Sequence, residues 1–183
     1  MALKATIFKL DLQIADMDRG YYQTHALTIA RHPSETDERM LVRILTFALF
    51  ASDRLGFTRG ISTDDEPDIW QKRLDDEIEL WIDLGQPDEK RIKKACGRAR
   101  QVVIVTYASR SAGVWWQQIG SSLDRFGNLR VIHLPDGSST ELAALAQRNM
   151  QLQCTIQDGD VWLGDDHTTV HLAPATWKSP DSR

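Results

Sequence analysis

The stretch that decides the fold is residues 64–100, which read DDEPDIWQKRLDDEIELWIDLGQPDEKRIKKACGRAR. Its middle part, IELWIDL at residues 78–84, has the residue types and the alternation that are typical of a strand. Pro87 follows, where the first turn of a helix accepts proline. Nine acids and two bases lie between residues 64 and 83, but six bases and two acids lie between residues 88 and 100. Carboxylates that suit a divalent cation therefore lie beside bases that suit phosphate.

Length and composition indicate one globular domain that spans residues 1–183. The apolar fraction of 42% supports a core, and the net charge of −4 disfavours a protein coated with nucleic acid. Cys96 and Cys154 lie far apart and form no CxxC pair, which indicates a reducing compartment. We see no signal-peptide core, and the longest apolar run, residues 41–51, is too short for a membrane span. We therefore expect a cytoplasmic protein without a membrane partner.

The amino-terminal third predicts a β-hairpin followed by a helix. Residues 6–12 alternate, and residues 22–30 are rich in β-branched and aromatic types, so both segments are expected to be strands. Ser34 is a suitable N-cap for a helix that ends near residue 51. Short strands are expected in 56–62 and 67–71.

After the helix that Pro87 begins, the pattern alternates between strands and helices. The continuous apolar run at residues 101–107 is typical of a strand covered on both faces. The other expected elements are helices at 111–126 and 138–149, and strands at 129–134, 152–157, 160–163 and 168–172. Residues from Pro174 onward look loose. The order from residue 34 to 107 is helix, strand, strand, strand, helix, strand, which predicts an α/β or α+β fold with a mixed sheet flanked by helices.

The acids in this stretch suggest a metal site. A tight turn at Asp75-Asp76 would make opposed residues sum to 151, so that Asp68 faces Asp83. The same register places Trp70 opposite Trp81 and Lys72 opposite Glu79. Two carboxylates that close repel each other unless a cation lies between them, and Mg²⁺ or Mn²⁺ is the simplest such cation. The alternative is that both acids lie at a solvated strand end.

Glu79 has a supporting role in this hypothesis. It shares a strand face with Asp83, but four residues along a strand span roughly 13 Å, which is too far for one ion. Lys90, Lys93 and Lys94 lie on the helix that follows, and one of them would reach the phosphate of a substrate. The alternative is an ordinary solvated helix face.

Other chemistries find less support in the sequence. His167 and His171 fall on a strand pattern, so they are read as surface residues and not as zinc ligands. Cys96 lies on the apolar side of its helix and is read as core. Trp70 and Trp81 have the chemistry to stack on bases, but cross-strand packing explains them as well.

The sequence resembles the bacterial YaeQ family. The resemblance rests on Glu66-Pro67-Asp68-Ile69-Trp70, on ELWIDLGQPDE at 79–89 and on RIKKA at 91–95, and it covers nearly the whole chain. It implies a variant of the PD-(D/E)xK nuclease fold, with a core at about residues 34–107. It also implies that Asp68 and Asp83 hold Mg²⁺. Gly85 stands where that pattern has lysine, and an alignment on Glu79 puts Trp81 there instead.

Two functions follow as expectations. The first is a Mg²⁺-dependent, nuclease-like phosphodiesterase that acts on nucleic acid. In it Asp68 and Asp83 bind the metal, Glu79 supports them, and Lys90, Lys93 or Lys94 contacts the scissile phosphate. The second is a catalytically inactive nuclease-fold module that binds nucleic acid or a protein partner through the same surface. The acidic pair next to the basic helix motivates the first, and the missing in-strand lysine and the negative net charge motivate the second as the alternative.

Overall fold

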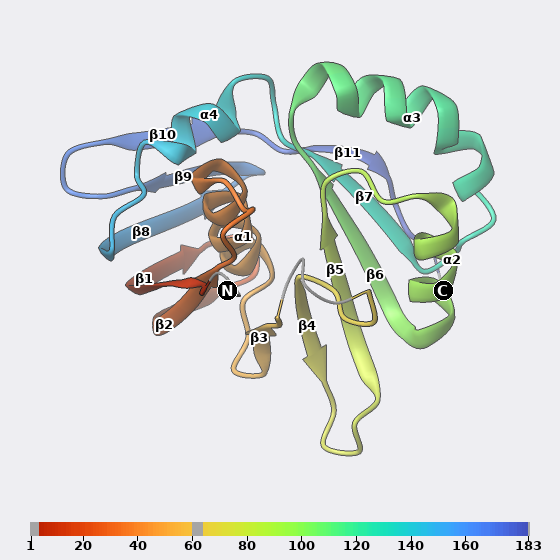
Figure 1. Cartoon of the computed structure of the whole chain (residues 1–183), viewed down its shortest axis with the longest axis horizontal. Helices are drawn as coiled ribbons and strands as arrows, with labels where there is room; N and C mark the ends of the chain where they lie inside the picture. The colour runs from red at the N-terminus through yellow and green to blue at the C-terminus, as the bar shows by residue number, and fades with distance from the viewer. Residues whose placement is uncertain (1–3, 60–63, 183) are drawn as a thin grey trace.

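A computed structural model describes residues 4–59 and 64–182, and these form an α+β fold with two mixed sheets (Figure 1). Sheet A has the strand order β10-β9-β8-β1-β2, and sheet B has the order β11-β7-β6-β5-β4-β3. The strands of sheet A are β1 (Thr6–Asp16), β2 (Tyr21–Arg31), β8 (Asn149–Gln157), β9 (Asp160–Gly164) and β10 (Thr169–Leu172). Those of sheet B are β3 (Leu55–Phe57), β4 (Ile69–Lys72), β5 (Ile78–Leu84), β6 (Ala99–Thr106), β7 (Leu129–His133) and β11 (Ala175–Lys178).

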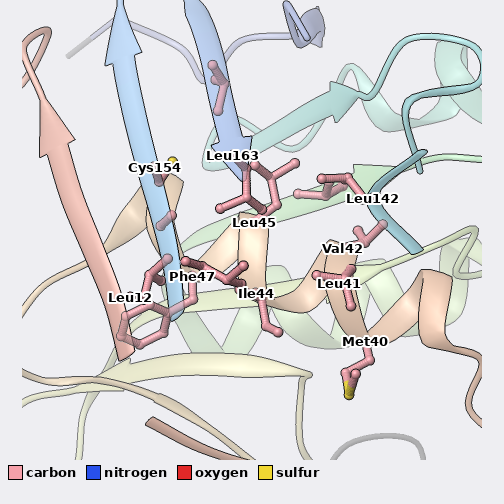
Figure 2. Close-up of a cluster of buried hydrophobic side chains, with 14 of the residues drawn as sticks. Leu12, Met40, Leu41, Val42, Ile44, Leu45, Phe47, Leu142, Cys154 and Leu163 are labelled. Atoms are coloured by element: carbon pink, nitrogen blue, oxygen red, sulfur yellow. The ribbon is translucent and has the colours of Figure 1, made fainter. Parts of the chain in front are cut away.

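The helix α1 (Asp37–Phe50) lies between the two sheets. Every residue from Met40 to Ala48 is buried, because one side of the helix packs on sheet A and the other on sheet B. Figure 2 shows Leu12 of sheet A beside Phe47 of α1, and Cys154 and Ile44 belong to the same core. The short helix α4 (Ser138–Ala143) packs against α1 in the same layer.

The other face of sheet B is covered by α2 (Glu89–Arg98) and α3 (Ser109–Leu123), as Figure 1 shows. These helices connect the parallel strands β5, β6 and β7. Side chains along β5 alternate between the two cores: Ile82 and Leu84 join the core of α1, whereas Trp81 joins the core of α2. The two helices therefore approach the strand from opposite faces of the sheet.

Most expected elements are confirmed, and the predicted order from helix α1 to strand β6 is correct. The predicted mixed sheet flanked by helices is confirmed as sheet B, and the amino-terminal hairpin pairs with β8 in a second mixed sheet. The residues after Pro174 are not all loose, since β11 pairs with β7 and Trp177 stacks on His133. The helix expected at 138–149 ends at Ala143. Ser62, the end of one expected strand, lies outside the described residues.

The start of α1 also differs from the expectation. Thr36 is the N-cap, and its hydroxyl accepts a hydrogen bond from the backbone N–H of Arg39. Ser34 instead hydrogen bonds with the ring of His32, two residues before it. Among residues 4–59 and 64–182, no helix has both the length and the apolar character to cross a bilayer.

Candidate functional site

The two acids of the predicted site lie where β4 begins and β5 ends. The predicted register is confirmed for three pairs, Ile69 with Ile82, Trp70 with Trp81, and Gln71 with Leu80. Beyond them the ladder shifts, so Lys72 pairs with Ile78 and the predicted pairing with Glu79 is wrong. The extra residue is taken up by a bulge next to the tight turn, where Asp76 adopts a positive φ.

Asp68 stands just before the first residue of β4 and stays bound to β5. Its backbone N–H donates to the carbonyl of Ile82 at 3.0 Å, and its Oδ2 accepts from the backbone N–H of Leu84 at 2.9 Å. The carboxylate thus accepts the hydrogen bond of the Leu84 N–H, a position where β4 supplies no backbone carbonyl. Asp83 lies between these two β5 residues, but the ladder begins with Ile69 and Ile82 and does not include the predicted pair of Asp68 with Asp83.

Asp83 is buried under α2 and is held by one arginine. Arg91 donates from Nε and Nη2 to the two carboxylate oxygens, at 2.8 and 3.0 Å. The same guanidinium donates to the carbonyls of Asp64 and Glu66, so it fastens the acidic segment to the sheet. The hydrogen bond with Asp83 raises the pKa of Arg91 against the opposing effect of burial. Asp68 also contributes to this shift, so both carboxylates lie within the electrostatic reach of one guanidinium.

Asp68 is held from the other face of the sheet. Arg39 of α1 donates to its Oδ1 at 2.7 Å and to Glu35 at 3.1 Å. Glu35 in turn accepts two hydrogen bonds from Arg43, at 2.8 and 2.6 Å, and both of these side chains are buried. Burial alone would lower the pKa of Arg39, but the charge and hydrogen bond of Asp68 outweigh it and raise that pKa. We call Glu35, Arg39, Arg43 and Asp68 the inner network.

Charge is balanced across the whole site. The inner network has two acids and two arginines, and the Asp83–Arg91 pair adds one of each. Buried ions are tolerated only when such partners neutralise them, because water no longer does so. The site is therefore complete without an added cation.

The donor set does not fit the Mg²⁺ ion that the family resemblance implies. All four carboxylate oxygens of Asp68 and Asp83 already accept N–H hydrogen bonds. The adjoining guanidinium groups would repel a divalent cation, and Mg²⁺ needs carboxylates open to octahedral geometry. Within the described residues no three His, Cys, Asp or Glu side chains are grouped to hold a metal. Metal binding by this pair stays a prediction that requires at least Arg91 to leave Asp83.

The other predicted residues are distributed around the site and not gathered at it. Glu79 accepts a hydrogen bond from Gln71 at 2.6 Å and pairs with Arg54. Lys94 pairs with Asp65 at 2.6 Å, on the exposed side of α2. Lys90 and Lys93 are exposed, and no described residue forms an ion pair or a hydrogen bond with their side chains.

Three arginines are the functional residues that sequence reasoning missed, although their spacing carried a signal. Arg91 lies four residues before the buried Ala95, so it shares the inward face of α2. Arg39 and Arg43 follow Glu35 at intervals of four in a helix whose next turns are wholly buried. Charges on a buried helical stripe indicate internal partners, and the acids on β4 and β5 supply them.

Comparison with known proteins agrees with this fold and its length. The profile of the YaeQ protein family matches residues 1–174. This chain belongs to the YaeQ family. It is 49% identical over 180 residues to "Uncharacterized protein YaeQ" of Escherichia coli K12, covering 98% of this chain and 99% of that protein. The same identity and coverage hold for the protein of that name in Salmonella typhi.

Two solved structures show the same architecture. The crystal structure of YaeQ from Xanthomonas axonopodis pv. citri superposes with a TM-score of 0.94 at 50% identity, over 96% of this chain and 99% of that one. The YaeQ structure from Pseudomonas syringae gives 0.89 at 33% identity, over 96% and 97% of the two chains. These names state no activity, and neither comparison bears on the nuclease fold that the resemblance implied. The surroundings of Asp68 and Asp83 therefore carry the information about function.

Proposed function

We propose that this YaeQ family protein is a non-catalytic binding module in which Asp68 and Asp83 stabilise the fold instead of holding a metal. The observation that supports the proposal is the full occupation of both carboxylates by Arg39, Arg91 and the backbone of Leu84. A nuclease needs these oxygens free to bind a metal ion and position water. Here they join three segments of the chain, which is a structural role.

A protein partner is better supported than nucleic acid. Most cations of α2 are already engaged: Arg91 by Asp83, Lys94 by the side chain of Asp65, and Arg98 by the carbonyl of Asp65. Lys90 and Lys93 remain exposed. Affinity for nucleic acid scales with the number of phosphates neutralised, and two free lysines on a chain of net charge −4 supply little of it.

The proposed surface continues from α2 to the start of α3. An open hollow of about 700 Å³ lies there, and its lining includes Gln86, Val114 and Trp115. Val114 is half exposed and lines this hollow. A hollow with an apolar anchor and a few polar groups, Arg110 among them, suits an acidic protein segment.

Metal binding and cleavage test the non-catalytic role directly. The expected result is that Mn²⁺ gives no heat of binding to the wild-type protein by calorimetry. We also expect no cleavage of single-stranded, double-stranded or branched DNA or RNA with Mg²⁺ or Mn²⁺. Binding of Mn²⁺ that disappears in Asp68→Asn, together with cleavage that disappears in Asp83→Ala, would establish the nuclease alternative.

The nuclease alternative keeps one observation in its favour. The elements α1, β3, β4, β5, α2 and β6 occur in the predicted order, with Asp83 on β5 and Asp68 just before β4. In that case Glu79 and the lysines at 90, 93 and 94 would keep their predicted supporting and phosphate-contacting roles. The arginine pairs count against it.

The binding surface is tested by charge reversal. Lys90→Glu with Lys93→Glu should abolish capture of an acidic protein from a bacterial lysate. A matched control, Lys4→Glu with Lys9→Glu, changes the net charge equally at exposed positions away from α2 and should capture normally. If both variants capture alike, the surface is wrong. Tight, salt-dependent binding of the wild type to DNA or RNA, lost in the first variant, would instead identify nucleic acid as the partner.

A further inference from the structure

Strand β2 forms a long open edge on sheet A. It runs for 11 residues and pairs only with β1, and Figure 1 shows it as the outermost strand of its sheet. The other edges are short: β10 and β11 have four residues each and β3 has three. Short edges are one way in which proteins prevent strand pairing between molecules. The edge at β2 lacks that protection.

The direction of the backbone groups on this edge follows from β1. The N–H of Lys9 donates to the carbonyl of Arg148 and that of Met17 to the carbonyl of Ile156, so odd residues of β1 face β8. Even residues of β1 therefore face β2, and the register pairs each of them with an odd residue, such as Leu12 with His25. In β2 it is then the even residues that turn N–H and C=O outward. The carbonyl of Ala30, which receives Arg43, confirms this direction.

The outward residues are Tyr22, Thr24, Ala26 and Thr28. All four are exposed, and no described residue hydrogen bonds to their backbone. Residues 21–30 contain no acid, lysine, arginine or proline, and the pairing with β1 runs without a bulge. Charge, proline and bulges are the devices that keep an edge strand from pairing, and this edge has none of them.

We propose that β2 pairs antiparallel with β2 of a second copy of this chain, which would join two copies of sheet A into one continuous sheet. A row of alternating donors and acceptors at strand spacing is complemented only by another extended strand. Between residues 1 and 183 no more than four consecutive residues lie outside the described part, too few to cover this edge. A second copy always supplies a matching strand.

The sequence of β2 is self-complementary in this orientation. A two-fold axis at Ala26 sets Thr24 of each copy opposite Thr28 of the other, a pairing that is favourable across strands. It also sets Arg31 of each copy opposite Tyr21 of the other, so that the two Arg31 side chains lie at opposite ends of the paired strands. A parallel alignment in register would place Arg31 against Arg31. The charge of Arg31 therefore favours the antiparallel arrangement.

The oligomeric state in solution tests the proposal. Sedimentation velocity of the full chain should show a reversible dimer whose population rises with concentration. Ala26→Pro removes only an outward N–H, which an edge strand tolerates, so the ladder to β1 stays intact. This variant should weaken dimerisation by about tenfold or more, the loss expected when about 1.4 kcal/mol of edge hydrogen bonding is removed.

A second variant keeps the test valid if proline disturbs folding. Thr24→Lys with Thr28→Lys charges the edge and should give the same loss, whereas Gln153→Lys, exposed in the middle of the same sheet, should dimerise normally. Circular dichroism checks that each variant is folded. A wild-type chain that stays monomeric at all concentrations overturns the proposal, as does a dimer that both edge variants leave unchanged. A monomeric chain that instead binds an extended synthetic peptide at β2 would assign the edge to another protein.

Discussion

The inner network and the Asp83–Arg91 pair neutralise two neighbouring acids in different ways. The inner network lies between the sheets, and the side chains of Glu35, Arg43 and Asp68 are at most 7% exposed. Arg91 is 28% exposed and divides its hydrogen bonds between Asp83 and the backbone of the acidic segment. The first arrangement belongs to the core and the second fastens a surface segment. Two acids that look equivalent in the sequence therefore differ in how much stability depends on them.

The largest expected effect is in the inner network. Arg39→Ala leaves the buried Asp68 carboxylate with one backbone donor and only the more distant charge of Arg91. Loss of one partner of a buried pair costs about 3–5 kcal/mol, so we expect the free energy of unfolding in urea to fall by about 3 kcal/mol. In the double variant with Asp68→Asn the loss should be smaller than the sum of the two single losses. Additive losses would show that the pair is not coupled.

Arg91→Ala should lower the free energy of unfolding by less, about 1–2 kcal/mol. Water reaches this guanidinium and can take over part of its hydrogen bonding when it is removed. Arg91→Ala should also have a local effect on the acidic segment. The backbone amides of residues 64–68 should exchange hydrogen faster, since their segment loses the bonds from Arg91 to Asp64 and Glu66. Lys90→Ala, on the same helix but exposed, is the control and should leave exchange unchanged. Equal destabilisation by Arg39→Ala and Arg91→Ala would erase the contrast between the two sites.

Local patterns predicted the strands and the acid register well. Alternation identified β5 with its bounds, and the acidic turn at residues 75–76 fixed the pairing of Trp70 with Trp81. The register then failed at Lys72, because nothing in a sequence pattern distinguishes a regular turn from one that absorbs a bulge.

The two-sheet architecture depends on pairings that local patterns do not encode. The strand β1 pairs in parallel with β8, which lies about 140 residues later in the chain, as in the pair of Lys9 with Asn149. Alternation shows that one face of each strand is buried, but not which sheet it joins. One signal was present: residues 40–48 are apolar almost all round the helix, and such a helix must be covered on both sides.

The sequence singled out Asp68 and Asp83, but it did not identify the side chains that hold them in the structure. The predicted strand register drew attention to Asp68 and Asp83, and the helix that follows β5 drew attention to Lys90, Lys93 and Lys94. The cations that reach the acids are arginines on two helices, and one of these helices lies on the opposite face of the sheet. Since side-chain reach depends on tertiary packing, spacing along the chain cannot rank such candidates.

Removing an arginine also tests whether it blocks a metal. In Arg91→Ala the carboxylate of Asp83 loses both donors, and Asp68 lies near it. Millimolar Mn²⁺ should then raise the melting temperature of this variant by about 2–4 °C, which corresponds to about 1 kcal/mol of binding linkage. The wild type should not respond, nor should Arg91→Ala combined with Asp83→Asn. A response of the wild type would mean that the arginines do not exclude the ion.

The smallest expected effect lies on the outer surface of α2, at the exposed pair of Lys94 and Asp65. The hydrogen bond from Lys94, aided by its charge, lowers the pKa of the Asp65 carboxyl. Because the folded-state pKa lies below the unfolded one, the pair stabilises the protein above the unfolded pKa of about 4, and this contribution is lost as pH falls through the folded pKa. Lys94→Ala should return the pKa toward its ordinary value in an NMR titration, with no measurable change in melting temperature at pH 7. A marked destabilisation by Lys94→Ala would show that the surface pair, and not Arg91 alone, fastens the acidic segment.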